Sequence, residues 1–430
     1  MQIMSNPDAA EQPVVDWSVD PAHPKNFARW RKWVMVVIVS FSSLCITCTS
    51  AIYSSTYEQT MVEFDVSELA ATVGLSVFIL EMGIDWAYVW GLTSAAFQSV
   101  AGGTISDLFT RQNLQLPMMV YTATPFAGPV LGPMIGGFMN YNTSWRWTFY
   151  VIIIWSASLW VLCIIFLKET YAPVLLRRRA SENSPGTPDS MKGALLKSLY
   201  RPFLLLSLEP MILCLCLYTA VMIGTLYLFF GAFPLVFAHT FGFNLWQIGL
   251  TFLGQLVGTM IGALFDPLWW WNLNRLVRNY QHETGDESGD FPPEFRLPPA
   301  ILGAPLPTIG MFWFGWSSYP DVHWIMPIIG SAFFGLGVFL AFQGIFTFLV
   351  DAYPLYAASA LAANAFLRSV FAAAFPLFGV QMYNALGYQW ATSLLAFLTV
   401  AMLPFPYIFF QFGPRIRAKS RFTADPAVKG

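Results

Sequence analysis

A few charged side chains interrupt otherwise apolar stretches of this sequence, and they are the residues best able to carry chemistry. They are Glu81, Asp85, Glu209, Asp266 and Arg368. Glu209 stands at the start of an apolar run, where it either carries protons or contacts a cationic compound, or serves as a structural acid at a helix N-terminus. Arg368 lies in the middle of another run, and it either takes part in binding or forms a fixed pair with Glu209 or Asp266.

Glu81 and Asp85 are four residues apart, so on a helix they share one face and repel each other unless one is protonated. A proton relay and a structural accident both fit this spacing. The four histidines are far apart in the sequence, and no hydrolytic, redox or metal-ligating constellation emerges. We therefore expect no enzyme activity, no cofactor and no bound metal.

A further group of residues combines aromatic faces with a few polar atoms, as sites for drug-like molecules require. Its members are Tyr218, Tyr227, Phe230, Gln343, Asn364 and Phe366. They are spread over three apolar runs. We expect them to line one cavity and to form, with Glu209 and Arg368, a pathway for substrate or protons.

The composition indicates the solvent in which these residues lie. Of the 430 residues, 56% are hydrophobic and only 11% are charged, whereas soluble domains carry roughly 25% charged residues. An all-α membrane protein surrounded by the lipid bilayer follows. The net charge of −2 argues against nucleic acid as a partner. The five cysteines lie within apolar runs, which indicates that they form no disulfide framework.

Ten apolar segments are predicted to cross the membrane. Nine are clear, namely 33–53, 117–139, 147–167, 210–237, 248–270, 299–317, 325–350, 357–383 and 390–410. The tenth, 69–105, is too long for one straight span and too short for three, so we predict one kinked or tilted crossing. One set of loops carries 20 Lys and Arg residues and the other set carries Arg146 alone. Both termini are therefore expected in the cytoplasm.

This topology divides the chain into two helical bundles with three polar segments. We predict a cytoplasmic tail (1–32), an N-terminal bundle of four spans (33–167), a flexible cytoplasmic linker (168–202), a C-terminal bundle of six spans (203–410) and a second cytoplasmic tail (411–430).

The run from Pro125 to Gly137 is the most specific feature of the sequence. Gly128, Gly132 and Gly136 fall four residues apart, so on a helix they form one face that a neighbouring helix can approach closely. Pro129, Pro133 and Gly137 complete the run, and its prolines predict kinks that are tolerated where packing or a cavity satisfies the freed carbonyls. A tight helix–helix contact is the simplest role for this spacing.

The whole run resembles the glycine-proline antiporter motif of drug:proton antiporters in the major facilitator superfamily. The resemblance to the fungal twelve-span branch of that family covers residues 29–84 and 97–421. It is carried by the segments 99–109, 145–150, 168–173, 201–203, 209–210, 231–234 and 375–378. It implies two bundles around a central cavity that opens alternately to each side of the membrane, and export of small organic compounds against proton entry.

One block of the family pattern is absent from this chain. Residues 71–84 resemble the first part of helix two and residues 88–106 the latter part of helix four, and Ala87 stands where the family has an arginine. We therefore expect a major-facilitator-like two-bundle fold with an incomplete N-terminal bundle. The resemblance implies a proton-coupled exporter. We expect it in the plasma membrane in preference to the vacuole. The alternative is a transport-deficient truncated or splice variant that acts only by binding or association in the membrane.

Overall fold

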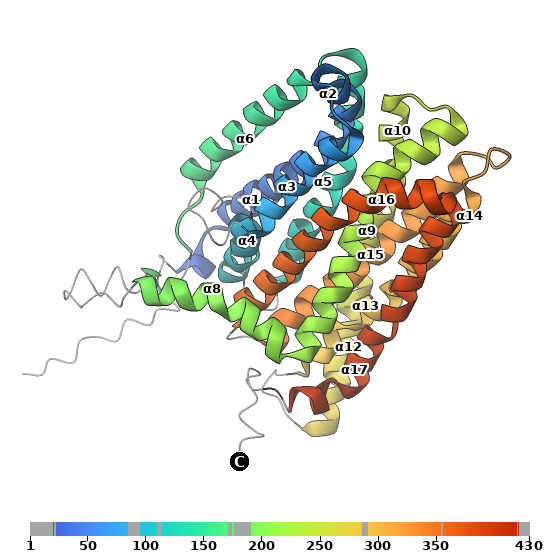
Figure 1. Cartoon of the computed structure of the whole chain (residues 1–430). Coiled ribbons are helices and arrows are strands. Elements are labelled where there is room, and N and C mark those ends of the chain that lie inside the picture. The colour runs from blue at the N-terminus through green and yellow to red at the C-terminus, as the bar shows by residue number, and fades with distance from the viewer. Residues whose placement is uncertain are drawn as a thin grey trace, which may run out of the picture.

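The computed structural model describes residues 20, 23–84, 95–109, 113–170, 174–175, 191–285, 291–353, 356–418 and 420. Within these residues every regular element is a helix (Figure 1). Helices satisfy their own backbone hydrogen bonds, which lipid cannot do for them. The predicted all-α membrane fold is therefore confirmed.

The N-terminal half is built around two long helices that pack on each other, α1 and α5. α6 packs mainly on α1, and both α3 and α4 contact the C-terminal half through α16. The helices of this half are α1 (Arg29–Ile52), α2 (Tyr57–Phe64), α3 (Glu68–Ile84), α4 (Ala95–Leu108), α5 (Gln115–Asn142) and α6 (Arg146–Phe166).

In the C-terminal half, α9 packs along α16, and α11 and α14 pack on α15. Its core is aromatic: the rings of Phe233 and Phe314 stack with centroids 5.1 Å apart, and both are fully buried. The helices are α8 (Met191–Leu208), α9 (Pro210–Phe241), α10 (Leu245–Thr251), α11 (Leu253–Leu264), α12 (Asp266–Thr284), α13 (Pro298–Gly303), α14 (Pro305–Ser317), α15 (Ile325–Ala352), α16 (Ala357–Met402) and α17 (Pro404–Arg417).

Several helices depart from the segments predicted from hydropathy. The predicted flexible linker spans residues 168–202, but its last part is helical: α8 begins at Met191. α12 continues through the polar sequence that follows the apolar segment 248–270. α16 covers the predicted span 357–383 and the first part of the span 390–410. Gly387 separates these two parts with a backbone φ of 78°, a conformation open to glycine and strained for other residues.

Six helices within the described residues are long and apolar enough to cross a membrane. They lie within 29–64, 146–166, 210–241, 245–284, 325–352 and 359–417. The predicted segment 69–105 forms two helices, α3 and α4, whose connection lies outside the described residues. The segment 299–317 is divided between the short helices α13 and α14. The total of ten crossings stays a prediction.

The two ends of the molecule differ in charge. α8, α12 and α17 have ends at the same end of the molecule in Figure 1. We call this end, which carries Arg201, Arg275, Arg296 and Arg417, the basic end. α2 and α10 lie at the opposite end. There the carboxylate of Glu63 accepts hydrogen bonds from the indole of Trp145, at 2.6 Å, and from the guanidinium of Arg146.

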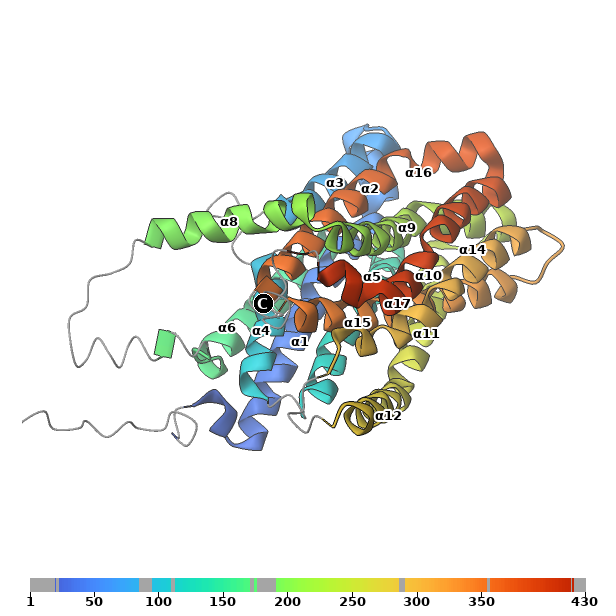
Figure 2. The same ribbon diagram turned by 90° about the horizontal axis from the view of Figure 1, so that it is seen from below.

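α6 is unusual among the long helices because almost none of it is buried. Figures 1 and 2 show it at the margin of the molecule, beside α1. Only Thr148 and Leu159 of its residues are buried, whereas Ile153, Trp160 and Ile164 are each at least 60% exposed. An apolar helix exposed on nearly every side requires lipid or other helices around it.

Candidate functional site

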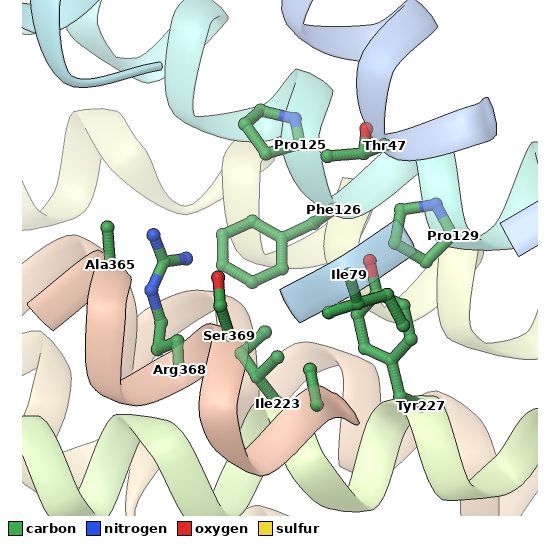
Figure 3. Close-up of a pocket in the computed structure, with 11 residues that line it drawn as sticks. Thr47, Ile79, Pro125, Phe126, Pro129, Ile223, Tyr227, Ala365, Arg368 and Ser369 are labelled. Atoms are coloured by element: carbon green, nitrogen blue, oxygen red, sulfur yellow. The ribbon is translucent and has the colours of Figure 1, made fainter. Parts of the chain in front are cut away.

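A small cavity of about 70 Å³ lies where the two halves meet (Figure 3). Five helices contribute to its wall: α1, α3, α5, α9 and α16. The lining residues are Thr47, Ile79, Pro125, Phe126, Pro129, Ile223, Tyr227, Ala365, Arg368, Ser369 and Ala372. Most of this wall is apolar, and among the described residues that line it Arg368 alone is charged.

Arg368 places its guanidinium beside the ring of Phe126 in this cavity (Figure 3). Its guanidinium carbon also lies 5.5 Å from the ring centroid of Phe342 and 5.4 Å from that of Phe346, both on α15. Such cation–π contacts compensate part of the cost of removing the cation from water. The Nε atom is buried without a hydrogen-bond partner among the described residues.

The structure does not pair Arg368 with Glu209 or Asp266. Glu209 is buried at the N-terminus of α9, and its carboxylate accepts hydrogen bonds from the Tyr353 hydroxyl at 3.2 Å and the Ser420 hydroxyl at 2.6 Å. It therefore ties α9 to the end of α15 and to the C-terminal tail, away from the cavity. This placement favours the structural role for Glu209.

Asp266 also has a partner other than Arg368. Its carboxylate accepts a hydrogen bond from the side-chain amide of Gln343, which joins α12 to α15. The amide oxygen of Gln343 is buried without a hydrogen-bond partner in the described part of the chain. Gln343 lies in the wall of a second, larger cavity, so it does not share the cavity of Arg368.

The remaining predicted site residues lie in three different parts of the structure. Tyr227 lines the central cavity, and its hydroxyl lies 2.7 Å from that of Ser50, which joins α9 to α1. Tyr218 and Asn364 are fully buried in the core of the C-terminal half, where the Asn364 amide donates to Thr219 at 2.6 Å. Phe366 lies outside the cavity, because its ring packs 5.1 Å from that of Phe203 on α8.

The glycines of α5 lie against two different helices. A Cβ atom added at Gly132 would lie 2.8 Å from the Cys48 carbonyl oxygen and the Ile52 nitrogen of α1, and one at Gly128 would lie 2.8 Å from the Cys48 nitrogen. A Cβ atom at Gly136 would lie 2.8 Å from the side chain of Ile52 and 2.9 Å from that of Ser55, which follows α1. The approach of a neighbouring helix that the four-residue spacing predicts is therefore present.

The last glycine of the motif faces the other half of the molecule. A Cβ atom at Gly137 would lie 2.8 Å from the carbonyl oxygen of Leu245 on α10, and one at Gly249 would lie 2.6 Å from the carbonyl oxygen of Pro133. Two halves joined so closely leave no room for side chains between them. The halves are thus in tight contact near the end opposite the basic end.

The larger cavity has a volume of about 700 Å³ and lies among α5, α12 and α15, at the side of the basic end. Its wall includes Arg296 and Asp351, whose side chains form an ion pair at 2.9 Å. Phe346 lines this cavity, and its ring also contacts the guanidinium of Arg368. One aromatic ring therefore lies between the larger cavity and the charged residue of the smaller one.

Asp85 and the side chain of Glu81 lie outside the described residues, and so does Ala87. The sequence also failed to indicate several residues that the structure brings to the cavity, such as Thr47, Ile79 and Ile223. For Phe126 a signal existed, because it lies within the motif between Pro125 and Gly128. A helix kinked by prolines in a membrane requires a cavity or a partner beside it, and the cavity lies there.

Comparison with known proteins identifies the lineage of this architecture. The sequence profile described as the Major Facilitator Superfamily matches residues 27–376. The chain belongs to the Major Facilitator Superfamily. It is accordingly an integral membrane transporter and not an enzyme, as its two-bundle fold and its motif had indicated.

Two fungal relatives and one solved structure illustrate this membership. The chain is 51% identical over 422 residues to the efflux pump atB of Aspergillus terreus, with 94% of this chain and 88% of that protein covered. It is 34% identical over 482 residues to the probable drug/proton antiporter YHK8 of Saccharomyces cerevisiae, covering 97% and 91%. The crystal structure of a POT family transporter in complex with 5-aminolevulinic acid matches its fold with a TM-score of 0.52 at 11% identity, covering 89% and 96%.

The length of the yeast alignment carries information of its own. It runs over 482 positions, although this chain has 430 residues. Within the aligned region, the yeast relative therefore contains residues that are missing from this chain.

Proposed function

We propose that this transporter exports small organic compounds in exchange for protons, by alternating access. The relatives named as an efflux pump and as a drug/proton antiporter support the substrate class and the coupling ion. The glycine-proline motif on α5 supports the same assignment. The basic end faces the cytoplasm in this proposal, because positively charged loops are retained there, and the protein lies in the plasma membrane.

One observation carries the mechanism. The larger cavity extends at the side of the basic end as far as Phe346, beside Arg368, while Gly137 and Gly249 hold the halves together near the other end. This arrangement supports a transporter that is open towards the cytoplasm. The opposite state requires the contact between α5 and α10 to separate while the larger cavity closes.

Two carboxylates adjoin the larger cavity, and we assign the proton pathway to them. Asp351 lines it directly, and Asp266 is held by Gln343, which lines it. Within the described residues the central cavity has no carboxylate, so a proton carrier there is not part of the proposal.

The test is transport by the purified full chain in liposomes that contain a pH-sensitive dye. With an imposed pH gradient, addition of a transported compound should produce proton movement that protein-free liposomes lack. Collapse of the gradient with an ionophore should stop uphill movement of the compound. Accumulation that persists after the collapse would contradict proton coupling.

A second function, binding without transport, is favoured by one observation. α6 is exposed on almost all sides, as expected if helices that normally cover it are missing, and the yeast relative has aligned residues that this chain lacks. Alternating access needs two bundles that close against each other at both faces. An N-terminal bundle open beside α6 would transport poorly.

The two functions are separated by a chimera. Residues 85–94 are replaced by the longer corresponding segment of the yeast relative, and transport by the two proteins is compared at equal amounts in liposomes. The second function predicts transport by the chimera alone. Equal transport by the unaltered chain would eliminate it.

A further inference from the structure

The central cavity contains a cation for which the described part of the chain provides no anion. The guanidinium of Arg368 contacts the faces of Phe342 and Phe346, and its Nε atom is buried without a hydrogen-bond partner. The titratable side chains that interact with it electrostatically are Tyr121, Tyr227 and Cys216, all of which are neutral at pH 7. No described side chain therefore compensates its positive charge.

Four described carboxylates of the C-terminal half are engaged elsewhere. Glu209 is bonded to Tyr353 and Ser420, and Asp266 to Gln343. Glu294 and Asp351 form ion pairs with other arginines at the basic end. None of these four acids can reach Arg368 without giving up a partner. Among the described residues, the negative charge is therefore left for a bound molecule to supply.

The cavities define the shape of that molecule. About 70 Å³ beside Arg368 is room for a carboxylate, since a water molecule occupies about 30 Å³ of the liquid. It is too small for a drug-sized body, which needs a pocket of about 300 Å³ or more. The larger cavity of about 700 Å³ has that room, and Phe346 is shared by its wall and by the environment of Arg368.

The larger cavity also has the chemistry of a site for an apolar body. Its wall includes Met118, Trp269, Phe295 and Phe346, contributed from both halves of the molecule. Aromatic and thioether side chains pack well against flat apolar ligands. An acidic head at Arg368 and an apolar body in the larger cavity would be joined past the ring of Phe346.

We propose that Arg368 binds the carboxylate of an amphipathic organic anion, whose apolar body occupies the larger cavity. This inference rests on the proposed function in one respect: the bound anion is the compound that is transported. A guanidinium binds a carboxylate through two parallel hydrogen bonds, which selects acids over neutral or cationic compounds of the same shape.

The test uses three naphthalene compounds that differ only in their head group: 2-naphthoate, 2-naphthamide and 2-naphthylmethylammonium. Binding to the full chain in lipid nanodiscs is measured by calorimetry at pH 7, without any gradient. The wild-type chain should bind the carboxylate about tenfold or more tightly than the amide, as a charge-assisted hydrogen bond provides, and should bind the ammonium compound least.

Substitutions then locate the effect. Arg368→Gln should remove the preference for the carboxylate and leave binding of the amide unchanged, whereas Arg368→Lys should keep part of the preference. Arg201→Gln is the matched control, since it removes an arginine that lies over Tyr356 at the basic end. It should leave the preference intact. If Arg368→Gln fails to fold, the wild-type series and Arg368→Lys still decide the matter.

Three outcomes would overturn the proposal: a wild-type preference for the amide or the ammonium compound, an unchanged preference in Arg368→Gln, or no binding of 2-naphthoate at millimolar concentration. Because no gradient is present, the measurement is independent of proton-coupled export. Carboxylate binding through Arg368 without proton movement in liposomes would refute the proposed function alone. Proton-coupled transport of the amide or ammonium compound would refute the anion site alone.

Discussion

Replacing Gly132 with alanine tests whether the contact between α1 and α5 leaves no space for even one methyl group. The new Cβ would lie 2.8 Å from the Cys48 carbonyl oxygen, the Ile52 nitrogen and the Ala51 Cβ. Ordinary contacts begin at 3.4 Å, so the helices have to separate by about 0.6 Å. Two of the three atoms belong to the backbone of α1, which cannot rotate away as a side chain would.

The magnitude follows from two opposing effects. Overpacking a tight contact costs about 1–3 kcal/mol, while alanine in place of glycine within a helix gains about 0.5–1 kcal/mol. Gly102→Ala is the matched control, because an added Cβ on that residue of α4 meets nothing within 4 Å. Both variants gain the same helix preference, so their difference in unfolding free energy should isolate the contact, at about 1–3 kcal/mol.

The assay is thermal unfolding of the purified protein, followed with a dye that fluoresces when it reacts with thiols. Its five cysteines are free, and Cys45, Cys48 and Cys216 are buried, so native thiols report unfolding. Tryptophan fluorescence serves as a second probe, since Cys48 lies at the altered contact. Gly132→Ala should melt below the wild type, and Gly102→Ala at or above it. Equal melting temperatures for the two variants would refute the argument from the glycine spacing.

Three further outcomes are expected. In single-cysteine variants of intact cells, Asp321→Cys should react with an impermeant maleimide and Gly285→Cys should not; the reverse pattern would invert the orientation. Glu209→Ala should destabilise the protein by about 1–3 kcal/mol, because the buried Tyr353 hydroxyl loses its partner, and adding Tyr353→Phe should restore part of the loss in denaturation experiments. Hydrogen bonds from its indole and guanidinium partners lower the pKa of Glu63 below the ordinary 4.5, so its stabilisation is complete above pH 4.5 and is lost as the pH falls through the lowered pKa. The melting temperature should therefore fall less steeply with acidification in Glu63→Gln than in the wild type, and identical slopes would contradict this role.

The sequence was informative where one local pattern determines the structure. Hydropathy indicated the long helices, since lipid excludes unpaired backbone, and the spacing of Gly128, Gly132 and Gly136 indicated the face that meets α1. It was uninformative where a partner lies far away in the chain. Nothing near Glu209 indicates that Ser420, 211 residues later, bonds to it, and nothing near Phe366 indicates that its ring turns towards α8.

Hydropathy also failed to indicate that an apolar helix continues into polar sequence. α12 was expected to end near residue 270, yet it reaches Thr284. Hydropathy marks where a helix leaves the lipid, but backbone hydrogen bonding continues in water as long as no residue ends it. Gly285 ends it, with a φ of 67°, which is the conformation that terminates helices.

The two contacts of α5 have different mechanical consequences. Gly128, Gly132 and Gly136 join it to α1 and the turn that follows, within one half of the molecule, so these elements move as one body. Gly137 joins it to α10, in the other half, where the same closeness has to be broken in each transport cycle. Contacts between bare backbone atoms and glycine need no side-chain rearrangement to separate or to form again. A helix with glycine on both faces can therefore stay fixed to its own bundle while it closes and opens against the other.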